Sequence, residues 1–329
     1  MPERAPRATP VRHALSHPAA RIAMLGIAAA AAIALFLLLD LPGRADYALG
    51  LRWRTVTGML VVAIAVGAST VLLQTVTANR ILTPGIMGFD AIFMTIQVTG
   101  VLVIGPRLLL GTSPTVLWGI ELVLMAGIVV LLYWWLFIKR RLDLHLIVLV
   151  GLVIGTMLRA VTTFLQRLLD PDAFAVVQNL VFASFTAIDR DLLLPTGVLV
   201  VAAGVSIVPI LRSLDALALG RSTAIGLGVA HRRVVMHAVV AIAVMVAAST
   251  ALVGPVLFFG LLVANAAYSL VGHRHAASIP AAALIGAIVL IGGQTVLARG
   301  LGFATELPVV IEFLGGALFI LLVLTGRTR

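Results

Sequence analysis

Four charged side chains lie inside long apolar segments of this sequence: Asp90, Glu121, Arg159 and Glu312. A charge buried in a lipid bilayer costs roughly 3 kcal/mol, so each of these groups should face protein or water. Carboxylates in such places can carry a coupling proton or line the path of a solute. They can also form structural ion pairs, and Glu121 with Arg159 is one pairing that the sequence suggests.

Several catalytic chemistries lack the residues that they need. A phosphate-binding loop requires Gly-x-x-x-x-Gly-Lys-Ser/Thr, and the only lysine, Lys139, is followed by Arg140. The histidines show no His-Glu-x-x-His spacing, and His273-Arg274-His275 is more typical of a solvated loop than of a metal site. The chain has no cysteine, which excludes disulfides, thiolate metal sites and cysteine nucleophiles. We therefore expect no catalytic residue, no metal site and no bound cofactor on this chain.

The composition excludes a soluble protein. Of the 329 residues, 61% are hydrophobic and 11% are charged, and the mean hydropathy is +1.16. Soluble domains are about 45–50% apolar and about 25% charged. At about 20 residues for each span, the roughly 200 apolar residues provide about ten membrane-spanning helices. The formal net charge of +10 does not indicate nucleic-acid binding, because the basic residues stand at the ends of apolar runs, where they set topology.

Ten apolar runs are candidate spans. They occupy residues 22–39, 58–78, 89–104, 115–138, 146–165, 192–211, 234–253, 255–271, 279–298 and 307–324. The segment 234–271 would reach about 57 Å as one helix, nearly twice a bilayer core, so it must turn, and Gly254-Pro255 is the expected place. The apolar segment 173–188 is short and contains Gln178 and Asn179, which favours an interfacial or re-entrant helix.

The charge distribution predicts the orientation. Residues 1–20 hold four prolines and three arginines, which predicts a disordered basic tail in front of a membrane domain at 21–329. The first apolar run is long for a signal peptide and lacks a clean cleavage site, so we interpret it as an uncleaved span. With the N-terminus inside, fifteen basic residues are inner and seven are outer, which predicts that both termini are cytoplasmic. The inner ones are Arg4, Arg7, Arg12, Arg21, Arg80, Lys139, Arg140, Arg141, Arg212, Arg221, Arg232, Arg233, Arg274, Arg327 and Arg329, and the outer ones are Arg44, Arg52, Arg54, Arg107, Arg167, Arg190 and Arg299.

The inner loop at residues 214–231 is the most informative segment. It reads L-D-A-L-A-L-G-R-S-T-A-I-G-L-G-V-A-H, and its apolar spacing predicts two short helices that break at Gly220 and end at Gly226 or Gly228. Such helices can lie in the lipid interface or dock into a groove of a partner protein, and composition alone favours the lipid interface.

Three stretches resemble the permease subunits of iron–siderophore ABC importers, whose relatives include the cobalamin importer permease. N-R-I-L-T-P-G-I-M-G at 79–88 resembles the family's N-P-L-A-D-P-G-L-L-G. L-A-L-G-R-S-T-A-I-G-L-G-V at 217–229 resembles L-S-L-G-E-E-T-A-R-S-L-G-V, the helices that enter the ATPase cleft. Residues 254–272 resemble G-P-I-x-F-V-G-L-I-V-P-H followed by a glycine. The resemblance runs from about Arg52 to the C-terminus.

The chain also departs from the family pattern. Arg80 replaces a proline, Arg221 takes a usually acidic position, and Ala264-Asn265 stands where Pro-His is typical. The variant I-L-T-P-G-I-M-G-F-D at 81–90 resembles the branch that handles catecholate-type or mixed siderophores.

The resemblance implies an all-α polytopic permease of about ten transmembrane helices that moves a ferric siderophore into the cytoplasm as half of a homo- or heterodimeric pore. A separate cytoplasmic ABC ATPase would bind ATP and Mg²⁺, an extracytoplasmic siderophore-binding protein would deliver the chelate, and a lipid bilayer would surround the pore. The coupling helices would lie at about 213–230, and the residues implied in ATPase coupling are Leu217, Leu219, Gly220, Arg221, Ala224, Leu227 and Gly228. The residues implied in binding-protein docking are Arg52, Arg54 and Arg299, and those implied in the translocation path are Arg159, Gln178, Asn179 and Glu312.

Other interpretations stay open at this point. An ion-coupled secondary transporter could use Asp90, Glu121 or Glu312 for a proton, although the sequence shows no clear internal repeat of the kind common in such folds. A structural or assembly protein of the membrane is a third class. The outer arginines could be plain interfacial anchors. The patterns Gly151-x-x-x-Gly155 and Gly315-Gly316 are more typical of helix packing than of substrate contact.

Overall fold

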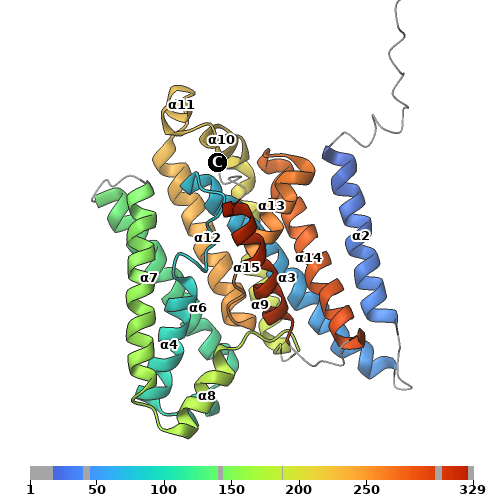
Figure 1. The fold of residues 1–329 in the computed structure, drawn as a ribbon, viewed down its shortest axis with the longest axis vertical. Coiled ribbons are helices and arrows are strands. Elements are labelled where there is room, and N and C mark those ends of the chain that lie inside the picture. Colours follow the sequence, from blue (N-terminus) through green and yellow to red (C-terminus); the bar gives the residue numbers. More distant parts are fainter. Residues whose placement is uncertain (1–17, 40–44, 140–143, 187, 301–305, 325–329) are drawn as a thin grey trace, which may run out of the picture.

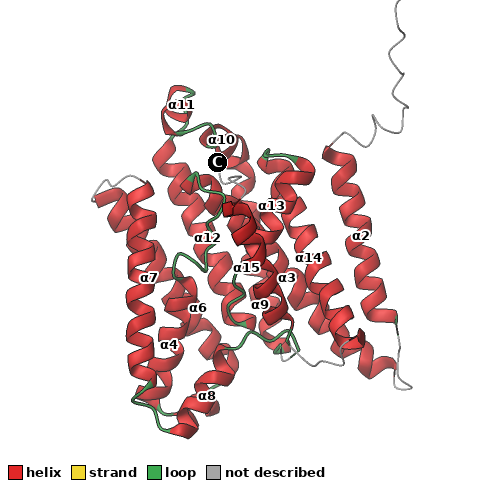
Figure 2. Ribbon diagram, viewed as in Figure 1, coloured by secondary structure: helices red, strands yellow, loops and turns green. Residues whose placement is uncertain are grey.

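The computed structural model of the protein describes residues 18–39, 45–139, 144–186, 188–300 and 306–324. Within these ranges every regular element is a helix (Figure 2). The long helices are α2 (Pro18–Leu38), α3 (Ala45–Thr77), α6 (Pro114–Tyr133), α7 (Leu144–Gln166), α9 (Arg190–Ile207), α12 (His231–Val253) and α14 (His275–Gly300). The others are α4 (Phe89–Ile104), α5 (Pro106–Gly111), α8 (Pro171–Val181), α10 (Leu211–Leu217), α11 (Arg221–Gly226), α13 (Phe259–Val271) and α15 (Leu307–Leu324), with a π-helical segment η1 at Trp134–Lys139 and a 3₁₀ turn η2 at Val208–Ile210.

All ten apolar runs predicted from the sequence become helices. Seven helices are long and apolar enough to cross a membrane, and the shorter α4, α13 and α15 account for the other three runs. The prediction of an all-α, multi-pass membrane protein is therefore confirmed. The described chain begins at residue 18, so the predicted tail at 1–20 lies almost wholly outside the described residues.

The boundaries of several helices differ from the prediction. α3 begins at Ala45, well before the predicted start at residue 58, so Arg52 and Arg54 lie on a helix rather than before it. Charged side chains lower hydropathy, but arginine is a good helix former. α13 begins at Phe259 rather than at 255, and the helix predicted at 173–188 ends at Val181.

α3 and α12 form the centre of the bundle, and α2 and α7 lie on its two sides (Figure 1). Most of α3 and α12 is buried, whereas α2, α6 and α7 expose most of their surface. α10 and α11 lie at one end of the bundle and α8 lies at the other (Figure 1). The exposed outer helices are expected to meet lipid or other subunits.

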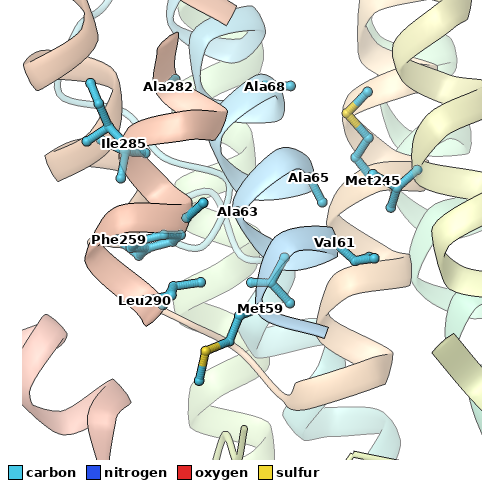
Figure 3. Packing of buried hydrophobic residues seen from close by; sticks show 14 of the residues in the cluster. Met59, Val61, Ala63, Ala65, Ala68, Met245, Phe259, Ala282, Ile285 and Leu290 are labelled. Atoms are coloured by element: carbon cyan, nitrogen blue, oxygen red, sulfur yellow. The ribbon is translucent and has the colours of Figure 1, made fainter. Parts of the chain in front are cut away.

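Small residues bring α3 and α14 into close contact. A β-carbon on Gly67 of α3 would lie 3.0 Å from the carbonyl carbon of Ala282, and one on Gly286 of α14 would lie 3.1 Å from the β-carbon of Ala63. Phe259 of α13 lies in the same core (Figure 3). Small residues favour association in lipid because they let two backbones approach closely. This core fixes the frame on which the candidate site is built.

Two non-helical segments, which we call breaks, each separate a long helix from the shorter helix that follows it. The first joins α3 to α4 and ends at Gly88 with φ 104°, and the second joins α12 to α13 and begins at Gly254 with φ 89°. The predicted turn at Gly254-Pro255 is confirmed. At about 1.5 Å per residue α4 reaches only about 24 Å and α13 about 20 Å, less than the roughly 30 Å of a hydrocarbon core. One end of each helix must therefore be covered by protein.

Candidate functional site

A small cavity, lined mostly by apolar side chains, lies where the two helix breaks meet. Its volume is about 30 Å³, and it is lined by residues 83–85 and Asp90 on one side and by residues 254–257 on the other. The two breaks touch, because a β-carbon on Gly85 would lie 2.8 Å from Cδ2 of Leu257. Irregular backbone inside a membrane is tolerated only where protein or a water-filled cavity surrounds it. The fold therefore places irregular backbone and the Asp90 carboxylate together inside an apolar bundle.

Asp90 stands in the first turn of α4 beside this cavity. Its Oδ2 accepts a hydrogen bond from Nη1 of Arg159 on α7 at 3.1 Å, with 9% of the aspartate side chain and 38% of the arginine side chain exposed. The buried Oδ1 of Asp90 has no hydrogen-bond partner in the described chain. A helix N-terminus favours a negative charge. The ion pair is thus only half satisfied, and it opens toward the surface on its arginine side.

The suggested pairing of Glu121 with Arg159 is wrong. Oε1 of Glu121, on α6, accepts a hydrogen bond from Nε2 of Gln97 at 2.8 Å, whereas Arg159 binds Asp90. Each pair therefore joins α4 to a different neighbour: Gln97 of α4 binds Glu121 of α6, and Asp90 of α4 binds Arg159 of α7.

Close packing of α7 on α4 explains this choice. A β-carbon on Gly155 would lie 3.0 Å from Cα of Gly88, and one on Gly151 would lie 3.6 Å from the terminal methyl group of Met87. Arg159 stands one turn beyond Gly155 and therefore reaches the start of α4. The prediction that Gly151 and Gly155 serve helix packing is confirmed.

Glu312 of α15 approaches the same region. Glu312 is half-buried and stands almost one turn before Gly315 on this helix. α15 is held there by Phe258, because a β-carbon on Gly315 would lie 2.5 Å from Cβ of Phe258. The structure therefore joins Arg159 directly to Asp90, and the contact of α15 with Phe258 brings Glu312 toward the second break.

The other two predicted path residues lie elsewhere. Gln178 is half-buried and Asn179 is exposed on α8, and α8 packs through Val177 against Val98 and Val101 in the later half of α4. Val98 is about 12 Å along the helix from Asp90. The structure does not join Gln178 and Asn179 to the Asp90–Arg159 pair, and their role stays a prediction.

The predicted coupling residues lie on or beside α10 and α11, which project from one end of the bundle (Figure 1). The two short helices expected there are confirmed. Leu217 and Ala224 are buried and hold the two helices to the body of the protein. Leu219 and Leu227 are 66% and 63% exposed, and Ile225 beside them is 52% exposed. The surface that a partner could touch is therefore these three side chains, which we call the coupling surface.

Glycines set the ends of α11. Gly220, with φ 101°, precedes its first residue, Arg221, and Gly228, with φ 81°, follows its end. Only glycine adopts such angles without strain. The predicted break at Gly220 is confirmed, and Arg221 lies exposed at the start of α11.

Asp215 ties α10 to the rest of the molecule. Its Oδ1 lies 2.6 Å from Nδ1 of His275 and accepts a hydrogen bond from the His275 backbone N–H at 2.9 Å. Nε2 of the same ring lies 2.7 Å from Oγ1 of Thr75 on α3. His275 is 2% exposed. Sequence reasoning missed this relay, because Thr75, Asp215 and His275 lie far apart in the sequence.

His273, next to the relay, lines an open pocket of about 250 Å³ with Arg80 and Tyr268. Partial burial, and then the nearby Arg80 charge, lower the pKa of His273 below its usual value. No group of three or more side chains able to hold a metal occurs among the residues that the structure describes.

Two of the three predicted docking arginines converge on the end of α2. Arg52 donates to the carbonyl oxygens of Phe36, Leu37 and Leu39, and Arg299 donates to those of Leu35 and Leu39. Cations are favoured at a helix C-terminus, where carbonyl groups lack partners. Arg54 is exposed on α3, and of the three it has the side chain most accessible to a partner.

The sequence matches known transport proteins over nearly its whole length. The FecCD transport family matches residues 24–325. The petrobactin import system permease protein YclO of Bacillus subtilis (strain 168) is 37% identical over 305 residues, which cover 92% of this chain and 96% of that protein. The petrobactin import system permease protein FatC of Bacillus anthracis is 30% identical over 273 residues, 83% of this chain and 77% of that protein.

A solved structure has the same fold. It is described as an inward-facing conformation of a metal-chelate type ABC transporter, and it aligns with a TM-score of 0.80 at 20% identity, covering 93% of this chain and 99% of that chain. At this identity the likeness establishes the arrangement of helices.

Proposed function

The chain belongs to the FecCD transport family, and from this premise we propose that it is the membrane-spanning permease subunit of an ABC importer for a ferric siderophore. The family match over residues 24–325 is the observation that carries the proposal. Petrobactin is the first substrate to test, because two relatives are named as petrobactin permeases. The iron would cross inside its chelate, so the chain needs no iron ligands of its own.

The charges of the bundle support an anionic chelate. The Arg159 side chain binds Asp90 and is still 38% exposed. A cation in this position attracts the negative charge of a ferric catecholate. Asp90 holds the arginine in place, because an ion pair fixes the guanidinium's direction. We expect Arg159 to line the path and Asp90 to position it.

A separate cytoplasmic ATPase would supply the energy. The coupling surface of Leu219, Ile225 and Leu227 is apolar and projects on short helices, as a helix-in-groove contact requires. We propose that the coupling loop and both chain ends lie in the cytoplasm, and the excess of basic residues expected on that side supports this orientation. A second permease subunit, identical or different, would complete the pore, and an extracytoplasmic binding protein would meet the opposite face near Arg54.

Uptake into vesicles tests the transport function. The complex is reconstituted with its ATPase and binding protein, and iron-55 is supplied as ferric petrobactin, ferric enterobactin or ferric citrate. We expect uptake that needs internal ATP and favours one chelate. If uptake survives loss of the ATPase but stops when the proton gradient collapses, the ABC importer proposal is wrong and the chain is a secondary transporter.

One observation keeps that second candidate worth testing. The structure contains paired broken helices, α3–α4 and α12–α13, with a carboxylate at one break, and such pairs are common in secondary transporters. The proton-gradient arm of the uptake assay decides between the two functions.

The coupling surface has its own test. Leu219→Asp and Leu227→Asp should reduce ATPase co-purification more than tenfold while the permease still inserts, because both side chains are exposed and each change places a charge in an apolar contact. Leu168→Asp is the matched control, since Leu168 is 58% exposed outside the coupling loop. Equal ATPase yield from all three variants would remove the coupling surface from the proposal.

A further inference from the structure

A long groove lies between α9 and α12, and none of the residues assigned to transport above lines it. Its volume is about 710 Å³, and apolar side chains such as Leu199, Val240 and Val244 form most of its wall. Its polar side chains gather toward one end, at Arg232, Arg233, His237 and Ser206. No residue that lines it is acidic.

The groove has the length of one membrane leaflet. From Arg233 to Val244 it follows α12 for eleven residues, which is about 16 Å. Half of a hydrocarbon core is about 15 Å deep. A chain that enters beside the arginines would therefore reach the middle of the bilayer when it reaches Val244.

Hydrogen bonds fix two of the side chains at the polar end of the groove. Nε2 of His237 lies 3.2 Å from Oγ of Ser206, which links α12 to α9 across the groove. Nη2 of Arg232 donates to the carbonyl oxygen of Phe137 at 3.2 Å, which fixes this arginine at the mouth. Arg233 is exposed beside it. Two guanidinium groups above an apolar channel are complementary to one phosphate above an acyl chain.

We propose that this groove binds one anionic phospholipid of the inner leaflet, with its phosphate at Arg232 and Arg233 and an acyl chain along Leu199, Val240 and Val244. The proposal rests on the orientation inferred for the coupling loop, which places the start of α12 at the cytoplasmic surface. Because α12 begins directly after α11, the bound lipid would brace the junction between the coupling surface and the bundle.

Native mass spectrometry of the purified permease in mild detergent tests this binding. Phosphatidylglycerol and phosphatidylcholine with identical acyl chains are added in equal amounts. We expect phosphatidylglycerol to be retained severalfold over phosphatidylcholine, and Arg233→Gln to reduce that preference about fivefold, the effect typical of one arginine near an anionic headgroup. Arg190→Gln, which removes the same charge from the other end of α9, should leave it unchanged.

The shape of the groove gives a second measurement. Val240→Trp should fill the channel and lower retention of both lipids, whereas Val201→Trp, an exposed position on α9 that does not line the groove, should not. Because the chain has no cysteine, a single Val240→Cys variant reports what covers the groove. Cross-linked dimers through that cysteine would assign the groove to a second copy and overturn the proposal.

Equal retention of the two lipids, or an unchanged preference in Arg233→Gln, would overturn it as well. These measurements need neither ATPase nor siderophore, so their failure leaves the transport function standing. Failure of the uptake assay, in turn, leaves the lipid measurement intact.

Discussion

Two units of this molecule share a plan and differ in chemistry. In the first, α3 breaks before the half-length α4, and α7 packs on the break through Gly88 and Gly155. In the second, α12 breaks before the half-length α13, and α15 packs on the break through Phe258 and Gly315. Both breaks use a glycine with positive φ, and both face the same small cavity.

The difference between the units separates architecture from function. The first break carries a charge, because Asp90 begins α4 and binds Arg159. The second break carries none of its own and faces the cavity with residues 254–257. Since a neutral break forms equally well, the ion pair is not needed to interrupt a helix. Because a charge inside an apolar bundle is costly, the ion pair supports the proposal that Arg159 lines the path.

The largest expected effect concerns the glycines of the two breaks. Gly254→Ala would place a β-carbon 2.8 Å from Cα of Ala183, and Gly88→Ala would place one 3.0 Å from Cα of Gly155, both at positive φ. Backbone strain of about 1–3 kcal/mol adds to overpacking of about 1–3 kcal/mol. We expect a large fall in thermal stability in detergent, greater for Gly254→Ala.

Gly105→Ala is the matched control for these two changes. Gly105 also has a positive φ, 86°, but a β-carbon there meets nothing within 4 Å. It should lose only the strain contribution, about 1–3 kcal/mol. Equal losses at all three glycines would mean that the contacts between helices do not matter, and the shared plan of the two units would lose its physical basis.

The second prediction concerns the charge that distinguishes the units. Arg159→Gln leaves the buried Asp90 carboxylate without its cation and should cost about 2–3 kcal/mol. Asp90→Asn leaves an arginine that is already partly exposed to solvent, and should cost about 1 kcal/mol or less. Both variants should lower siderophore uptake at least tenfold, because one lacks the cation and the other lacks its positioning residue.

A double-mutant cycle completes this test. The variant with both Asp90→Asn and Arg159→Gln should be more stable than Arg159→Gln alone, since no uncompensated buried charge remains. Glu312→Gln at the neutral break is the comparison. Uptake that stays normal in all of these variants would make the ion pair structural and remove the contrast between the units.

Much of the fold follows from the sequence because apolar runs and breaking residues act locally. Gly254-Pro255 had to turn, since one helix over 234–271 would exceed the bilayer, and the positive φ of Gly220 divides the coupling loop as its spacing predicts. The early start of α3 was missed, because Arg52 and Arg54 lower hydropathy without opposing a helix.

The site was harder to predict because its contacts join distant segments. Arg159 could be paired only once the neighbour of α7 was known, and hydropathy carries no such information. One signal was available: Gly155, one turn before Arg159, marks the face of α7 that meets another backbone, and Gly88 precedes Asp90 by two residues. The relay through His275 gave no comparable signal, because Thr75 and Asp215 are each ordinary in their own segments.

The third prediction concerns that relay, which ties α10 to α3 and α14 at the coupling end. His275→Leu removes the hydrogen bonds of the ring to Asp215 and Thr75, and about 1–2 kcal/mol should be lost because Asp215 keeps some contact with solvent. Hydrogen exchange in α10 should become faster. His275→Asn, whose amide can replace the donor at Nδ1, should restore most of the protection. Unchanged exchange in His275→Leu would show that α10 is held by its apolar contacts alone.

The smallest effects come from two non-glycine residues with similar strain, one in each unit. Ala78 follows α3 with φ 50°, and Phe258 precedes α13 with φ 54°. Ala78 is exposed, so Ala78→Gly relieves strain without losing a contact and should stabilise the protein by up to about 1 kcal/mol. Phe258→Gly relieves the same strain but removes the β-carbon that faces Gly315 and a ring that lies 6.0 Å from the ring of Phe319. An aromatic pair is worth about 0.5–1.5 kcal/mol beyond the area it buries, so this variant should be the less stable one.

Opposite signs in the two melting shifts would show that the first unit tolerates its strained turn, whereas the second uses its strained turn to hold α15. A stabilising Phe258→Gly would instead detach α15 from the comparison.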